Sequence, residues 1–64
     1  MANTQQTLNK IRSRIRRVVG ESARIDDAFF TFDRDSGRVV TNRKIDGYHF
    51  IFNLEGELIK QHRD

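Results

Sequence analysis

The chain has 64 residues, a formal net charge of +3 and no cysteine. Its length predicts one small domain, 1–64, and the missing cysteines exclude disulfides and thiolate metal ligands as supports for a thin core. Two histidines, His49 and His62, cannot form a structural zinc site unaided. Self-association is the remaining support, so we expect a homodimer with no metal and no cofactor.

The amino terminus is polar and predicts no export signal. Residues 1–7 lack the basic and apolar regions of a signal peptide. The longest apolar run, Ala28–Phe30, is far shorter than the roughly 18 residues that a membrane span needs. We therefore expect no membrane segment and a cytoplasmic location, with which the lack of cysteine is compatible.

Residues 4–19 predict an amphipathic helix that ends at Gly20, a residue suited to a left-handed C-cap. Its apolar residues recur at spacings of three and four and form one stripe: Leu8, Ile11, Ile15, Val18 and Val19. Its charged residues are all basic: Lys10, Arg12, Arg14, Arg16 and Arg17. Residues 1–20 thus hold five of the twelve bases and none of the nine acids. This uneven charge predicts one basic working face.

The rest of the chain predicts four strands, at about 28–34, 38–44, 48–53 and 57–62. Three turn signals separate them, each with two residues followed by glycine: Asp35-Ser36-Gly37, Ile45-Asp46-Gly47 and Leu54-Glu55-Gly56. This pattern is typical of a three-residue hairpin loop closed by a glycine bulge. Asp46-Gly47 is also compatible with a two-residue type I′ turn.

We prefer three glycine-bulge turns, because this register keeps four of the five phenylalanines on one face of the sheet. One row of that face is then Phe32, Val40, Phe52 and Leu58, and the next is Phe30, Asn42, Phe50 and Lys60. The helix would cover this face with Leu8, Ile11 and Ile15. The predicted fold class is α+β, an N-terminal helix packed on one face of a four-stranded antiparallel β-meander in the order α-β-β-β-β.

The opposite face of the predicted sheet has an apolar centre made by Phe29, Val39, Ile51 and Ile59. An exposed patch of this kind is typical of an interface, although ordinary strand propensity also explains it. We expect self-association through this face, with edge-strand pairing as the alternative. The row Phe29, Arg43, His49 and Gln61 places aromatic and cationic groups together, as in proteins that stack unpaired bases, although a solvated or dimer-buried row is the alternative.

The basic helix is the main functional indication. Arginine dominates it, and the planar guanidinium suits bidentate contacts with phosphate. We expect nucleic-acid binding, as an accessory or regulatory factor, through Lys10, Arg12, Arg14, Arg16 and Arg17, with Arg43 and His49 as lesser candidates. An acidic protein surface is the alternative partner, as for an inhibitor or adaptor of phage or mobile-element type. A purely solvated helix face is the third interpretation.

Enzyme chemistry has little support in the sequence. No serine has a credible histidine–acid pair, and no Walker or Rossmann glycine pattern occurs. The acids of Asp33–Gly37 resemble the start of a calcium loop, but Lys44 stands where the bidentate glutamate is required. We therefore expect no catalytic residue and no small-molecule substrate.

Overall fold

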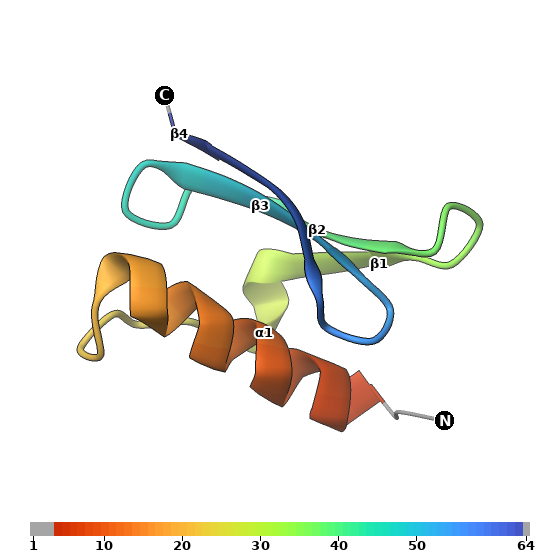
Figure 1. Cartoon of the computed structure of the whole chain (residues 1–64), viewed down its shortest axis with the longest axis horizontal. Coiled ribbons are helices and arrows are strands. Elements are labelled where there is room, and N and C mark those ends of the chain that lie inside the picture. The colour runs from red at the N-terminus through yellow and green to blue at the C-terminus, as the bar shows by residue number, and fades with distance from the viewer. Residues whose placement is uncertain (1–3, 64) are drawn as a thin grey trace.

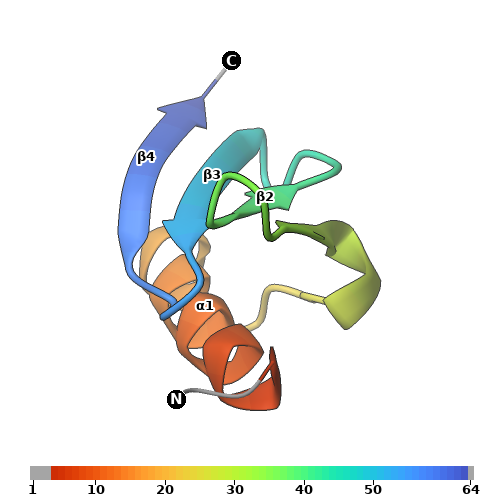
Figure 2. The same ribbon diagram turned by 90° about the vertical axis from the view of Figure 1, so that its right-hand side faces the viewer.

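The computed structural model describes residues 4–63, which form one helix lying against one face of a four-stranded antiparallel sheet (Figures 1 and 2). The elements in chain order are α1 (Thr4–Val19), the 3₁₀ helix η1 (Asp27–Phe29), β1 (Phe30–Asp33), β2 (Arg38–Thr41), β3 (Tyr48–Asn53) and β4 (Leu58–Arg63). The strands lie side by side in chain order. The predicted α-β-β-β-β layout is confirmed. No helix of residues 4–63 is long and apolar enough to cross a bilayer.

The helix α1 buries the predicted stripe against the sheet. Leu8, Ile11 and Ile15 are buried, and Thr7 is buried beside them. Beyond the last helical residue, Gly20 adopts a φ of 110°, and its N–H donates to the carbonyl oxygen of Arg16 at 2.9 Å. This is the predicted end of the helix, where a left-handed residue satisfies one of the last free carbonyls.

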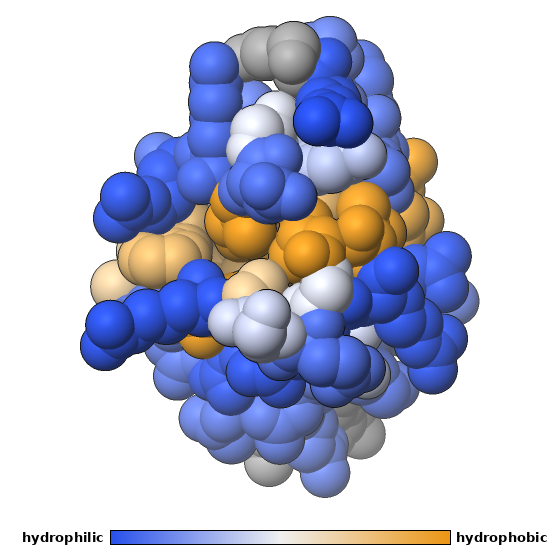
Figure 3. Space-filling model, turned by 90° about the vertical axis from the view of Figure 1, so that its left-hand side faces the viewer, coloured by the Kyte–Doolittle hydropathy of each residue, from blue (hydrophilic) through white to orange (hydrophobic). Residues whose placement is uncertain are grey.

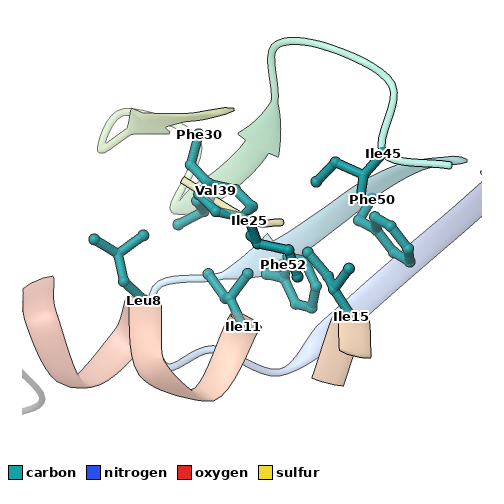
Figure 4. Packing of buried hydrophobic residues seen from close by; sticks show 9 residues of the cluster. All are labelled: Leu8, Ile11, Ile15, Ile25, Phe30, Val39, Ile45, Phe50 and Phe52. Atoms are coloured by element: carbon teal, nitrogen blue, oxygen red, sulfur yellow. The ribbon is translucent and has the colours of Figure 1, made fainter. Parts of the chain in front are cut away.

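The core lies between α1 and the sheet (Figure 4). Phe50 and Phe52 of β3 stack with ring centroids 5.9 Å apart, and both are almost fully buried. The helix and the connections close the core around these rings. The buried apolar residues are Leu8, Ile11, Ile15, Ile25, Phe30, Val39, Ile45, Phe50 and Phe52.

The hairpin between β1 and β2 differs by one residue from the predicted register. Asp33 pairs with Arg38, so the loop has four residues, and the Asp33 carboxylate accepts hydrogen bonds from the N–H groups of Asp35 and Ser36. Phe32 consequently lies opposite Val39. Val39 is fully buried in the core, so its predicted place on the outer face is wrong, and half-buried Val40 takes that place.

The turn between β2 and β3 is the two-residue alternative, so the predicted glycine bulge is wrong there. Ile45 bridges Tyr48, while Asp46 and Gly47 have φ values of 52° and 81°, as a type I′ turn requires. Between this bridge and the Val40–Ile51 pair, the β2 side has four residues and the β3 side has two, so two residues of the β2 side are unpaired. That pairing displaces β2 by one residue from its predicted position against β3.

The displacement of β2 against β1 and its displacement against β3 leave β1 and β3 in their predicted positions relative to each other. Val39 lies opposite both Phe32 and Phe52, where Val40 was predicted. A one-residue slip at each side therefore exchanges only the two faces of β2. The four phenylalanines of β1 and β3 stay on one face, as predicted.

The turn between β3 and β4 follows the prediction. The Asn53 N–H donates to the Glu57 carbonyl oxygen at 2.9 Å, and Gly56 has a φ of 88°. Phe52 pairs with Leu58, but Phe50 pairs with Gln61 instead of the predicted Lys60. The cause is a one-residue bulge at Ile59, which no turn signal announces.

Candidate functional site

The five cations of α1 fall on two different flanks of the helix. At about 100° per residue, Lys10, Arg14 and Arg17 share one flank, while Arg12 and Arg16 share the other. The first three are exposed and the other two are half-buried. The single basic face that the composition suggests is therefore divided by the way the helix packs.

Arg12 lies against the connection that follows α1, and Arg16 shares its flank of the helix. Arg12 forms an ion pair with Asp27 of η1. The Nε atoms of both arginines are buried without a hydrogen-bond partner in the described part of the chain. One of the five predicted ligand-binding cations is thus held by a carboxylate of its own chain, and it fastens α1 to η1.

The other flank, which we call the open flank, consists of Lys10, Arg14 and Arg17. Within residues 4–63, none of these three side chains has an ion-pair partner. They line one wall of a shallow groove of about 620 Å³, together with Asn9 and Ser13. The other wall is Gly56, Glu57 and Leu58, from the last turn and the start of β4.

The two walls of this groove are held together by close packing. The Thr7 hydroxyl donates to the Leu54 carbonyl oxygen at 2.7 Å. A Cβ atom placed on Gly56 would lie 2.8 Å from the Cβ of Lys10, so the turn reaches the helix only because residue 56 is glycine. The open flank is therefore presented by a rigid frame. Glu57 is the one carboxylate that lines the groove, and its Oε1 accepts from the Asn53 amide at 3.0 Å.

The lesser candidates Arg43 and His49 lie away from the open flank. Arg43 is exposed, and its guanidinium lies 4.6 Å from the ring centroid of Phe29. His49 is half-buried, with Nδ1 3.4 Å from the Thr41 hydroxyl, and it pairs with His62 across β3 and β4. The predicted row of Phe29, Arg43, His49 and Gln61 therefore does not form, because His49 lies opposite His62 and not Gln61. Arg43 and Phe29 are nevertheless in contact.

The predicted self-association face is altered by the register. Val39 belongs to the core, and Phe29 lies in η1. Ile51 is half-buried on the outer face, opposite Val40, and Ile59 is 47% exposed. The apolar residues of the outer side are thus Val40, Ile51 and Ile59.

Sequence reasoning missed a second group of cations, at the end of the molecule where the β2–β3 turn and the end of α1 lie. Arg24, Arg43 and Lys44 line a hollow there, and Arg63 lies over the Tyr48 ring, 5.3 Å from its centroid. Only the meander brings these distant residues to one end (Figure 1). The Asp46-Gly47 signal for a tight turn was the one available indication of this grouping.

The opposite end of the molecule carries most of the turn carboxylates. The β1–β2 and β3–β4 turns both lie there, since alternate turns of a meander share one end. Asp33, Asp35, Glu55 and Glu57 lie in or beside these turns, with Arg34 and Arg38 among them. The charge of the fold is therefore polarised along the strands. Among residues 4–63, no three His, Asp or Glu side chains group closely enough to hold a metal ion.

No family model, no curated protein and no solved structure matches this chain.

Proposed function

We propose that this protein binds nucleic acid through the open flank of α1, as a non-catalytic accessory or regulatory factor. The observation that carries the proposal is the set of three exposed cations, Lys10, Arg14 and Arg17, with no carboxylate partner in the described chain. At 1.5 Å per residue, they span about 10 Å of the helix axis. A nucleic-acid strand presents about three phosphates over that length.

The repulsion among these cations also favours an anionic ligand. Lys10 and Arg14 are four residues apart, and Arg14 and Arg17 are three apart. Like charges at these spacings destabilise a helix by about 0.2–0.5 kcal/mol per pair. A bound phosphate backbone neutralises both pairs at once.

The test is fluorescence anisotropy with labelled single- and double-stranded DNA and RNA over a salt series. We expect binding in low salt that weakens steeply as salt is added. A triple variant of the open flank, Lys10→Gln, Arg14→Gln and Arg17→Gln, leaves three phosphates of a single strand without their cations. Each such phosphate accounts for about 0.7 of the slope of log K against log salt, so the slope should fall by about 2.

The matched control removes the same charge elsewhere. Arg34, Arg38 and Lys60 are also exposed, and none of them lies on α1. The variant Arg34→Gln, Arg38→Gln and Lys60→Gln should keep most of the salt slope. An equal fall of the slope in both triple variants would leave only a general effect of net charge and would overturn the proposed site. Displacement of the nucleic acid by poly-glutamate at equal charge would instead favour an acidic protein surface as the partner.

We also propose that a second copy of the chain covers the outer face of the sheet. Its support is the two-layer architecture, in which no element of residues 4–63 covers Val40, Ile51 and Ile59. A chain of 64 residues has a small core. Dimerisation through this face would bury apolar surface that the monomer leaves exposed to water.

A further inference from the structure

Two guanidinium groups lie over aromatic rings at the end of the molecule that carries the β2–β3 turn. Arg43 lies over Phe29 at 4.6 Å, near the β1 edge of the sheet, and Arg63 lies over Tyr48 at 5.3 Å, near the β4 edge. Both distances are within the range of a cation–π interaction. An arginine backed in this way presents a flat, cationic surface to solvent.

A hollow of about 410 Å³ lies beside the Arg43–Phe29 pair. Its apolar lining comes from Val19, Ala23, Phe29 and Ile45, and Arg24, Arg43 and Lys44 are the cations at its rim. Figure 3 looks onto this end and shows an apolar patch enclosed by hydrophilic residues. Asp46 is the one carboxylate in the lining, so cations dominate the rim.

The sheet is locally opened to place these cations. Between the Val40–Ile51 pair and the Ile45–Tyr48 bridge, residues 41–44 lie opposite only residues 49–50. The Thr41 hydroxyl accepts from the Phe50 N–H at 3.1 Å in the irregular stretch. Asn42 bonds to η1, through its N–H to the Phe29 carbonyl oxygen at 2.8 Å and through its amide to Ala28 at 3.0 Å. Extra residues of this kind redirect side chains, and here they leave Arg43 over Phe29.

We propose that this end of the molecule binds unpaired bases of a single-stranded nucleic acid. A base stacks on the guanidinium of Arg43, which Phe29 supports from behind, and a second base stacks on Arg63 over Tyr48. The phosphates beside the first base lie near the cations of the hollow, Arg24 and Lys44. This inference rests on the proposed function and specifies its ligand, because base faces are covered in a duplex and free in a single strand.

The experiment compares two single strands that have equal numbers of phosphates, an oligothymidylate and a fully abasic strand. Wild-type protein should bind the oligothymidylate about tenfold more tightly for each stacked base. The double variant Arg43→Lys and Arg63→Lys keeps the charge and removes the planar guanidinium. It should reduce this preference to near onefold while leaving the affinity for the abasic strand unchanged.

Two controls separate this inference from the proposed function. The open-flank triple variant should weaken the binding of both strands by a similar factor and so keep the preference. The variant Arg38→Lys, at the opposite end of β2, should change neither affinity. Equal wild-type affinity for both strands, or an unchanged preference in the double variant, overturns the base-stacking site alone. Absence of binding to either strand overturns the proposed function and this inference together.

Discussion

The hydroxyl of Thr7 donates a hydrogen bond to the carbonyl oxygen of Leu54 at 2.7 Å, which joins the first turns of α1 to the last hairpin turn. Thr7 is only 2% exposed, so water cannot replace this partner. A buried hydroxyl that donates to a carbonyl is costly to remove, because the carbonyl then loses its donor. The bond fixes where the open flank of α1 lies relative to β4.

Thr7→Val should therefore lower the free energy of unfolding by about 1–2 kcal/mol, as for a buried group left without its partner. Urea denaturation measures the change. Thr7→Ser keeps the hydroxyl and should recover most of the hydrogen-bond energy. Equal stability of Thr7→Val and wild type would show that the bond contributes nothing net.

Gly56→Ala should destabilise the fold by about 2–4 kcal/mol. The left-handed φ of 88° accounts for about 1 kcal/mol, and the 2.8 Å approach to the Cβ of Lys10 adds an overpacking cost. Gly37→Ala is the matched control, since Gly37 has a φ of 70° with open space around its Cβ position. It should cost only about 1 kcal/mol. Equal costs in thermal or urea unfolding would contradict the close contact between turn and helix.

The two valines of β2 test its register directly. Val39→Ala removes two methyl groups from the fully buried core and should cost about 2 kcal/mol. Val40→Ala changes the half-buried outer face and should cost less than about 1 kcal/mol. Urea unfolding of the two variants gives the comparison. A larger loss of stability in Val40→Ala than in Val39→Ala would instead support the predicted register, in which Val40 points into the core.

The outer face is tested by Ile51→Lys. If a second copy covers this face, the buried ammonium is unpaired, and the variant should be monomeric where the wild type is dimeric. Light scattering across micromolar concentrations measures both states. Gln61→Lys, exposed on the edge strand β4, is the control and should leave the dimer intact. A monomeric wild type would remove the proposed dimer altogether.

Local patterns predicted the elements of this fold, but they did not predict how β2 sits between its neighbours. The periodicity of Leu8, Ile11 and Ile15 and the glycine turns reflect short-range physics, and α1 and the β3–β4 turn lie as expected. The position of Val39 depends on turn length at both ends of β2. The Asp33 carboxylate lengthens one turn, and two extra residues beside the type I′ turn more than offset the shortening of the other. Neither effect alters the pattern of apolar residues on β1 and β3.

The candidate site was predictable to a similar degree. The basic character of α1 followed from the sequence. Phe29 and Arg43 were predicted to be neighbours in a strand row, but they meet where η1 contacts the irregular stretch after β2. The division of the helix cations did not, because the ion pair of Arg12 depends on where η1 brings Asp27. Arg63 was missed because its neighbour Tyr48 becomes known only once the bulge at Ile59 sets the register of β4.

The bulge at Ile59 has one more consequence, which concerns growth of the sheet beyond four strands. An edge strand with regular spacing is a template on which extended chains add and begin fibrils. The extra residue in β4 interrupts that spacing near the start of the strand, and Lys60 and Arg63 place charge beyond it. The β4 edge therefore offers no long, flat ladder to a passing polypeptide, as in natural sheets whose edges are built against edge-to-edge aggregation.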